Sequence, residues 1–245
     1  MLKYLNKIIP RFVKNQLIQL LCIKMAVTPI TKRSCNICDF KGYFKGFGRP
    51  YRLDARCPKC GSLERHRLLM LGIQRGAIEH FKKHDNSILH FAPEPILEKI
   101  FREQFDYYKT TDLIKKADIK LNIENINLED KKYDVVIANH VLEHVDDQKA
   151  SSEIHRILKD EGVFVCEVPL IEGWDKTYEN DEITDEKDRL IHFGQEDHVR
   201  FYGKDFRDRI TKNGFVLINE ITADEEDVIN FGLIRGEKVF VFKKK

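Results

Sequence analysis

The sequence predicts an α/β protein with a mostly parallel sheet, preceded by a small module that contains four cysteines. From residue 88 onward, short apolar segments alternate with helical segments, as in parallel sheets with crossover helices. Two Cys-x-x-Cys pairs precede that region. The 245-residue chain is 42% hydrophobic and 33% charged, with only 13 Gly and 7 Pro, which excludes a collagen-like or mostly disordered chain.

The net charge of +2 conceals a basic head and an acidic body. Residues 1–67 contain 15 Lys and Arg against three acidic residues, a net charge of +12, and the remaining 178 residues carry −10. Such an asymmetry is typical of a head that meets anionic surfaces or docks on its own body.

Residues 1–30 form a cationic amphipathic segment that Pro10 interrupts. Its longest uncharged stretch, Asn15–Ile23, has nine residues, whereas a bilayer-spanning helix needs about 20. Lysines persist through the segment and no small-residue cleavage site follows, which argues against a signal peptide. We expect a cytoplasmic protein whose segment lies on the inner membrane face, or packs on the protein's own surface or on a partner subunit.

Residues 31–61 contain two Cys-x-x-Cys pairs separated by 18 residues, and this spacing predicts a structural zinc site. The expected ligands are Cys35, Cys38, Cys57 and Cys60. Six cysteines in the whole chain are too few for a disulfide-stapled scaffold. Aromatic and basic residues alternate loosely between the pairs, which suits either RNA contact or the small core of a zinc ribbon.

The domain boundary is expected near residue 62, so that 62–245 form the body. Residues 62–86 read as a leading helix that His84-Asp85-Asn86-Ser87 ends. Three further helices are expected at Pro95–Phe105, Asp147–Leu158 and Asp205–Lys212. A proline begins the first of them, Gly162 follows the second, and Asn213-Gly214 closes the third.

Seven apolar segments of the body read as strands. They are Ile88–Ala92, Tyr107–Thr111, Ile119–Ile123, Tyr133–Asn139, Val163–Val168, Phe215–Ile221 and Lys238–Phe242. Pro169 stops the fifth strand, and the charged residues 170–200 read as an irregular insertion. Ligands of open parallel sheets bind beyond the carboxyl ends of the strands. Asp112 ends the second strand, where a carboxylate can accept hydrogen bonds from both hydroxyls of a ribose.

The segments Tyr133–Asp147 and Glu153–Gly162 resemble class I S-adenosylmethionine-dependent methyltransferases, and the similarity extends over residues 88–243. Together with the cysteine module and the stretch Phe193–Gly203, the chain resembles a bacterial subgroup often associated with surface-polysaccharide genes. The resemblance implies a Rossmann-like seven-stranded sheet, mostly parallel with its last strand antiparallel. It also implies S-adenosylmethionine as cofactor.

The first strand departs from the pattern of that family. His90 stands in place of an acidic residue, and Ala92 and Glu94 replace the first two glycines of the loop that approaches the cofactor. Glu94 is expected to hold the cofactor's ammonium group instead. The alternative is a non-catalytic methyltransferase-like binding protein that has lost the cofactor.

The resemblance also assigns positions on the following strands. Asn122 and Ile123 occupy the adenine-contacting position, and Asn139 lies at the end of the central strand beside the cofactor.

The turn after the central strand supplies the candidates for catalysis. His140, Glu143 and His144 share one face if the turn is helical, and His144 is the expected general base. Some methyltransferases with Glu-x-x-Glu-His here bind a divalent metal at the substrate hydroxyl, and His140 stands for the first Glu. His198, in the insertion, is a further catalytic candidate, or orders its loop by a hydrogen bond.

We expect a methyltransferase that acts on a small molecule or glycan. The alternative enzyme is an RNA methyltransferase that grips phosphates with the basic zinc ribbon. The motif does not encode the methyl acceptor, and nothing in the sequence indicates an oligomeric state.

Overall fold

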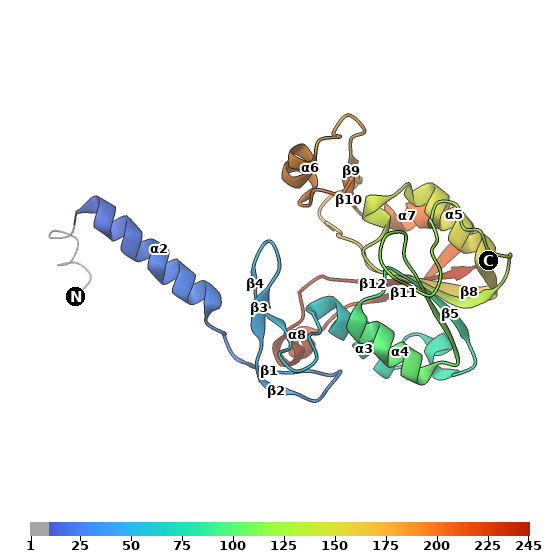
Figure 1. Ribbon diagram of the computed structural model, residues 1–245, viewed down its shortest axis with the longest axis horizontal. Coiled ribbons are helices and arrows are strands. Elements are labelled where there is room, and N and C mark those ends of the chain that lie inside the picture. Colours follow the sequence, from blue (N-terminus) through green and yellow to red (C-terminus); the bar gives the residue numbers. More distant parts are fainter. Residues whose placement is uncertain (1–9) are drawn as a thin grey trace. The chain divides into compact units, whose positions relative to one another are not determined.

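The computed structural model describes residues 10–245 and divides them into two compact units (Figure 1). Unit 1 comprises residues 10–67 and 225–233, and unit 2 comprises residues 68–224 and 234–245. Helix α3 (Glu64–Gln74) contains the junction at residues 67 and 68. The first nine residues of the cationic amphipathic segment lie outside the described residues.

Unit 1 is built from two hairpins and two helices. Strands β1 (Lys32–Ser34) and β2 (Lys41–Tyr43) form one antiparallel hairpin, and β3 (Lys45–Phe47) and β4 (Arg52–Arg56) form the other. Helix α2 (Arg11–Val27) precedes them, and α8 (Glu225–Phe231) joins them from the distant end of the chain. The four-cysteine hairpin module expected from the sequence is therefore present.

A buried arginine holds unit 1 together. The guanidinium of Arg67 donates to the carbonyls of Ser62, Ala55, Phe231 and Gly232 at 2.8–3.1 Å and stacks 4.7 Å from the ring centroid of Phe44. Such planar, multiply bonded burial suits arginine rather than lysine. Part of the basic charge of the head is thus structural and does not face a ligand.

Helix α8 also changes the charge of unit 1. Its acidic residues Glu225, Glu226 and Asp227 come from the acidic part of the sequence and reduce the net charge of the described residues of unit 1 from +10 to +7. Two other carboxylates pair within the unit, since Asp54 lies 3.3 Å from Arg33 and Glu64 lies 2.9 Å from Arg52.

Unit 2 contains a six-stranded sheet of order β11-β12-β8-β7-β5-β6. The strands are β5 (Ser87–Phe91), β6 (Tyr107–Thr111), β7 (Tyr133–Ala138), β8 (Leu158–Cys166), β11 (Phe215–Ile221) and β12 (Val239–Lys244). Strands β6, β5, β7 and β8 are parallel, and the last strand, β12, is antiparallel to both of its neighbours. The predicted α/β class with a mostly parallel sheet is confirmed.

The expected third strand at Ile119–Ile123 is wrong. Within the described residues it forms only one parallel bridge, between Thr111 and Ile119. The side chain of Asp118 explains why, because its Oδ2 accepts the Thr110 backbone N–H at 2.9 Å, where a neighbouring strand would place a carbonyl. Asp118 is held there by Arg102 at 2.8 Å. The sheet accordingly has six strands rather than seven.

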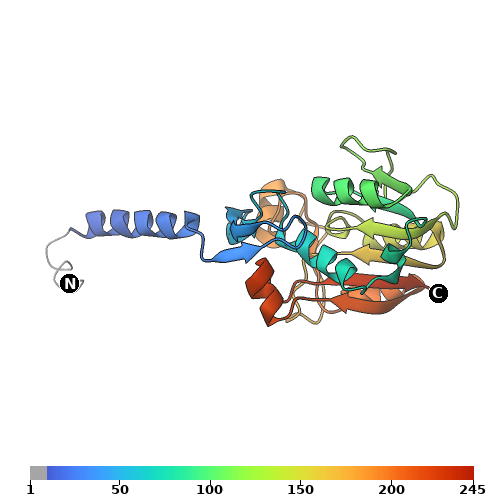
Figure 2. The same cartoon turned by 90° about the horizontal axis from the view of Figure 1, so that it is seen from below.

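Helices cover both faces of this sheet. Helices α5 (Asp147–Ile157) and α7 (Phe206–Thr211) pack on one face, and α4 (Pro95–Gln104) packs on the other (Figures 1 and 2). The side chain of Asp146 caps α5 by accepting from the N–H groups of Gln148 and Lys149. Alternate residues of each central strand point to opposite faces, and both faces are covered, which is why residues 135–138 of β7 and 163–166 of β8 are all apolar and buried.

Several expected boundaries also change. The leading helix ends at Gln74, before Gly76 with φ 73°, and a 3-10 turn (Glu79–Lys82) follows. The fifth strand extends back to Leu158 through a bulge and ends at Cys166. The insertion at 170–200 is ordered, with β9 (Tyr178–Glu179), α6 (Glu186–Phe193) and β10 (Arg200–Phe201).

Helix α2 buries none of its side chains. Its apolar residues are exposed, among them Phe12 at 73% and Leu20 at 61%. Within residues 10–245, no helix combines the length and apolarity needed to cross a membrane.

Candidate functional site

Buried polar atoms without partners collect where the parallel strands end. The side chain of Asn139, next after β7, is 3% exposed, and neither its Oδ1 nor its Nδ2 has a hydrogen-bond partner. The Thr111 hydroxyl, at the end of β6, is likewise buried and unbonded. Buried polar groups are normally satisfied, so these atoms mark a place for a polar ligand.

The backbone after β5 adopts a conformation that glycine favours. Ala92 has φ 45°, and its N–H donates to the Thr111 carbonyl at 2.8 Å. An alanine in this left-handed region is strained by about 1 kcal/mol. The turn expected of a glycine-rich cofactor loop is therefore retained although the first glycine is not.

His90 and Glu94 form a pair below this turn. His90 is fully buried, its Nδ1 is 2.8 Å from the Tyr108 hydroxyl, and its Nε2 is 3.4 Å from Glu94 Oε2. One oxygen of Glu94 thus faces the imidazole, and Glu94 is also the N-cap residue that precedes α4. Burial raises the pKa of Tyr108 well above its ordinary value, so that its hydroxyl stays protonated.

The remaining cofactor candidates follow β6. Asp112 is half-buried, and its Oδ1 accepts the N–H groups of Ile114 and Lys115 at 2.7 Å, which leaves Oδ2 for a ligand. Asn122 is exposed, and its Oδ1 accepts the Glu124 N–H at 2.9 Å. Ile123 is buried in the core beside the sheet.

The turn after β7 brings His140 and Glu143 together. His140 has φ 51°, and its Nδ1 is 3.1 Å from Glu143 Oε1. Glu143 is fully buried. Burial alone would raise the pKa of Glu143, but the hydrogen bond from His140 and the nearby imidazoles of His140 and His144 lower it below its ordinary value. Glu143 is therefore a carboxylate near neutral pH.

The insertion brings His198 to the same turn. The rings of His144 and His198 meet edge to face with centroids 4.7 Å apart. His198 is 4% exposed, and burial lowers its pKa despite the nearby Glu143. All three catalytic candidates therefore lie around Glu143, although His140 and His198 are 58 positions apart in the sequence.

An arginine fastens this part of the insertion to the turn. The guanidinium of Arg200 donates to the Leu142 carbonyl at 2.8 Å and pairs with Glu179 at 2.8 Å. The Val199 N–H donates to the Glu143 carbonyl at 2.9 Å. The sequence pattern alone indicates no role for Arg200 or Thr111. For Thr111, only its position next to Asp112 at the end of a strand could have indicated a functional role.

The four cysteines in unit 1 have the geometry of a zinc site. The Sγ atoms of Cys35 and Cys60 are 3.6 Å apart, as are those of Cys38 and Cys57, and all four lie within 4.8 Å of one another. Tetrahedral zinc with bonds of about 2.3 Å requires sulfurs about 3.8 Å apart. The residues fit the ion, and their pairing in two tight turns is the arrangement that the spacing predicts.

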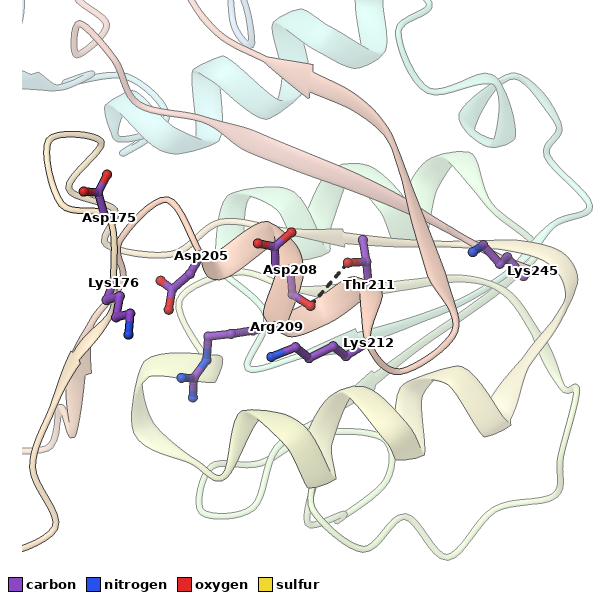
Figure 3. Close-up of a pocket in the computed structure, with 8 residues that line it drawn as sticks. All are labelled: Asp175, Lys176, Asp205, Asp208, Arg209, Thr211, Lys212 and Lys245. Carbon is purple, nitrogen blue, oxygen red and sulfur yellow. Dashed lines mark hydrogen bonds between the residues drawn. The ribbon is translucent and has the colours of Figure 1, made fainter.

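A separate pocket of about 680 Å³ lies beside α7 (Figure 3). Its lining residues are Asp175, Lys176, Asp205, Asp208, Arg209, Thr211, Lys212 and Lys245. Both signs of charge are present, and Thr211 is bonded within its own helix. None of the residues that the sequence singled out lines this pocket.

Comparison with known proteins agrees with the topology. Residues 97–166 match a family model described as a methyltransferase domain. This segment begins within α4 and contains β6, β7, the Glu143 turn, α5 and β8. No curated protein matches the chain.

Several solved structures are similar to this chain at low sequence identity. YcgJ from Bacillus subtilis is 14% identical with a TM-score of 0.50, over 74% of this chain and 99% of its own. A 1,6-didemethyltoxoflavin-N1-methyltransferase from Burkholderia thailandensis is 14% identical with a TM-score of 0.49, over 74% and 78%. An S-adenosylmethionine-dependent methyltransferase from Mesorhizobium loti is 11% identical with a TM-score of 0.48, over 69% and 96%.

Proposed function

We propose that this chain, whose larger unit is an S-adenosylmethionine-dependent methyltransferase domain, methylates a small molecule or a glycan. The observation that carries the proposal is the pair of buried, unbonded polar side chains, Asn139 and Thr111, at the carboxyl ends of parallel strands. Methyl transfer breaks the bond between the cofactor sulfonium and its methyl group, forms a bond from that methyl to the acceptor, and leaves S-adenosylhomocysteine.

Each cofactor candidate has a role in this proposal. Oδ2 of Asp112 accepts from the ribose hydroxyls, and Asn139 bonds the cofactor beside the methionine part. Ala92 provides the turn, and Glu94, backed by His90, attracts the ammonium group. Asn122 and Ile123 flank the adenine, where Ile123 offers apolar contact.

The acceptor lies on the side of the Glu143 turn. His144 is our proposed base for an acceptor hydroxyl, with His140 and His198 beside it. The insertion shields this region, since His198 is almost fully buried and Arg200 bonds the turn. A shielded site suits a small acceptor or the end of a glycan, because alignment and exclusion of water both favour transfer.

Isothermal titration calorimetry with S-adenosylmethionine tests this function. We expect one site per chain, and we expect Asp112→Ala to weaken binding about 10-fold, since a lost pair of hydrogen bonds to a charged group costs about 1.5 kcal/mol or more. Glu103→Gln, on an exposed position of α4, is the matched control and should bind as the wild type does. No heat of binding at millimolar cofactor would refute the enzyme and favour a non-catalytic binding protein.

RNA is the second candidate acceptor, and one observation favours it. The hairpins of unit 1 expose Tyr43 at 54%, Tyr51 at 49% and Phe47 at 40% among exposed lysines and arginines. Such surfaces stack bases and bind phosphates. RNA affinity that falls steeply with salt would support this acceptor, and RNA binding that is absent or insensitive to salt would exclude it.

We further propose peripheral membrane contact through α2. Its exposed apolar residues and its basic residues Arg11, Lys14 and Lys24 suit an anionic membrane surface on the cytoplasmic side. Cosedimentation with vesicles of anionic lipid, compared with neutral vesicles, tests this contact. If the protein sedimented equally with both kinds of vesicle, or with neither kind, the proposed membrane contact would be contradicted.

A further inference from the structure

Three potential metal ligands meet beside the proposed acceptor site. Glu143 and His144 lie in the 3-10 turn η2 (Leu142–His144), and His198 lies in the insertion just before β10. One ligand atom from each of the three lies within 4.8 Å of the other two. Bonds of about 2.0–2.2 Å place the ligand atoms of one metal ion at most about 4.4 Å apart, so a small inward shift of these side chains would let all three reach one ion.

Backbone carbonyls hold the Nδ1 atoms of both imidazoles. His144 Nδ1 is 3.1 Å from the Asp197 carbonyl, and His198 Nδ1 is 3.2 Å from the Phe193 carbonyl. A nitrogen that bonds a carbonyl must carry the proton, so each Nε2 is left with its lone pair. A backbone carbonyl on one ring nitrogen is the usual way in which proteins fix the other nitrogen on a metal.

Glu143 supplies a negative charge that lacks a full set of partners. Its side chain is fully buried, Oε1 faces His140 Nδ1 at 3.1 Å, and the buried Oε2 has no hydrogen-bond partner. Leaving a carboxylate oxygen buried and unbonded is costly unless a cation compensates it. His140 therefore orients Glu143 and leaves the second oxygen to the cluster.

We propose that Glu143, His144 and His198 bind one divalent transition-metal ion. Two imidazole nitrogens and one carboxylate favour ions such as Zn²⁺ or Mn²⁺ over Mg²⁺ or Ca²⁺, which prefer ligand sets made of oxygen atoms. Three protein ligands leave coordination positions open, as in catalytic rather than structural sites. The ligand set contains His198 rather than His140, so it is formed only when the insertion folds onto the turn.

The metal site would add an acceptor class to the proposed function, and this chemical consequence rests on that function. An acceptor hydroxyl that coordinates the ion would lose its proton to water more easily, and its oxygen would then take the methyl group from the sulfonium. With the ion bound, His144 would serve as a ligand, and the ion would take over the role of base that His144 has in the metal-free site. The acceptor class becomes molecules with a hydroxyl group, including glycans.

Binding of Mn²⁺ to the full chain, followed by electron paramagnetic resonance, tests the site. The zinc-loaded protein is titrated without S-adenosylmethionine, so that failure of cofactor binding does not affect the result. We expect one bound Mn²⁺ per chain. Glu143→Gln and His198→Asn should each weaken binding at least 10-fold, because second-shell changes alone cost 10- to 100-fold.

The two variants and one control make the outcome decisive. His198→Asn keeps a donor close to the position of Nδ1, so the bond to Phe193 can persist while the ligand nitrogen is removed. His192→Gln is the matched control, since His192 is an exposed histidine of the same insertion and bonds Tyr178. If Glu143→Gln fails to fold, the Mn²⁺ affinity of His198→Asn alone decides whether the cluster binds the ion. No stoichiometric Mn²⁺ on the wild type, or equal affinity in wild type and folded variants, would overturn the proposal.

Discussion

At the scale of single residues, backbone strain and buried polar groups without hydrogen-bond partners occur together at the carboxyl ends of the parallel strands. Ala92 holds a left-handed conformation and bonds the carbonyl of Thr111, whose own hydroxyl is buried without a partner. Asn139 lacks partners at the next strand. Backbone strain and buried polar groups without hydrogen bonds usually persist only where function requires them. Both features occur here at the same end of the sheet.

Replacement of Ala92 by glycine should stabilise the protein by about 0.5–1 kcal/mol. Glycine removes the cost of the left-handed backbone, and part of that gain is offset by the greater freedom of the unfolded chain. Urea unfolding of Ala92→Gly measures the change. Gly194→Ala is the converse control, since Gly194 has φ 80° and an added Cβ would lie 3.1 Å from the Phe201 ring, so this variant should lose stability. If Ala92→Gly were less stable than the wild type, the proposed backbone strain at Ala92 would be contradicted.

At the scale of elements, an ion-pair network ties α7 to the antiparallel edge of the sheet. Arg207 of α7 pairs with Glu220 of β11 and with Glu172 of the insertion, and Lys238 lies 2.8 Å from Glu220. The hydrogen bond from Arg207 lowers the pKa of Glu220 to about 2, although burial opposes the shift. Linked pairs of this kind contribute more than isolated surface pairs.

The network predicts a stability difference that depends on pH. The folded-state pKa of Glu220 lies below its ordinary value of 4.5, so its contribution is present above about pH 4.5 and is lost as the pH falls through 2. At pH 7, Glu220→Gln should cost about 1–2 kcal/mol, allowing for solvent screening. Urea unfolding at pH 7 and near pH 2.5 should show the difference shrinking. A cost that does not change with pH would exclude the charge as its cause.

Elements also show what the sequence can and cannot predict. The sequence pattern located the central strands β5 and β7, which are mostly apolar and buried, and also the edge strands β6 and β11. It failed at Ile119–Ile123, where the decisive contact is a side chain, Asp118, bonded to the edge of β6. In the same way, the histidines of the turn were recognisable locally. Their meeting with His198 depends on Arg200 and on the fold of the insertion.

At the scale of the whole molecule, unit 1 is a small structure with few buried apolar residues. Its cysteine cluster has only Cys35, Phe44 and Cys57 as buried members. Modules this small usually require a metal, a disulfide or a partner for stability. Arg67 donates to the carbonyls of Phe231 and Gly232, which lie far from it in the sequence. The contribution of α8 to unit 1 was therefore not predictable, because local sequence patterns do not indicate such distant contacts.

Removal of zinc should therefore unfold unit 1. We expect one tightly bound zinc per chain at the cysteines and a loss of hydrogen-exchange protection in residues 31–67 when Cys57→Ser removes a ligand. Cys22→Ser, at an exposed position in α2, is the control and should retain the zinc. Elemental analysis and hydrogen exchange measure both effects. A Cys57→Ser protein with full protection in this region would contradict a structural zinc site.

The most direct test of the methyltransferase assignment compares the S-adenosylmethionine affinity of wild type, Asn139→Ala and Asn122→Ala. Asn139 is buried without partners, whereas Asn122 is exposed and already bonded to Glu124. We predict that Asn139→Ala weakens binding at least 10-fold, about 1.4 kcal/mol, and that Asn122→Ala has a smaller effect. A wild type that does not bind, or an Asn139→Ala protein that binds as tightly as the wild type, would contradict a cofactor site at this end of the sheet.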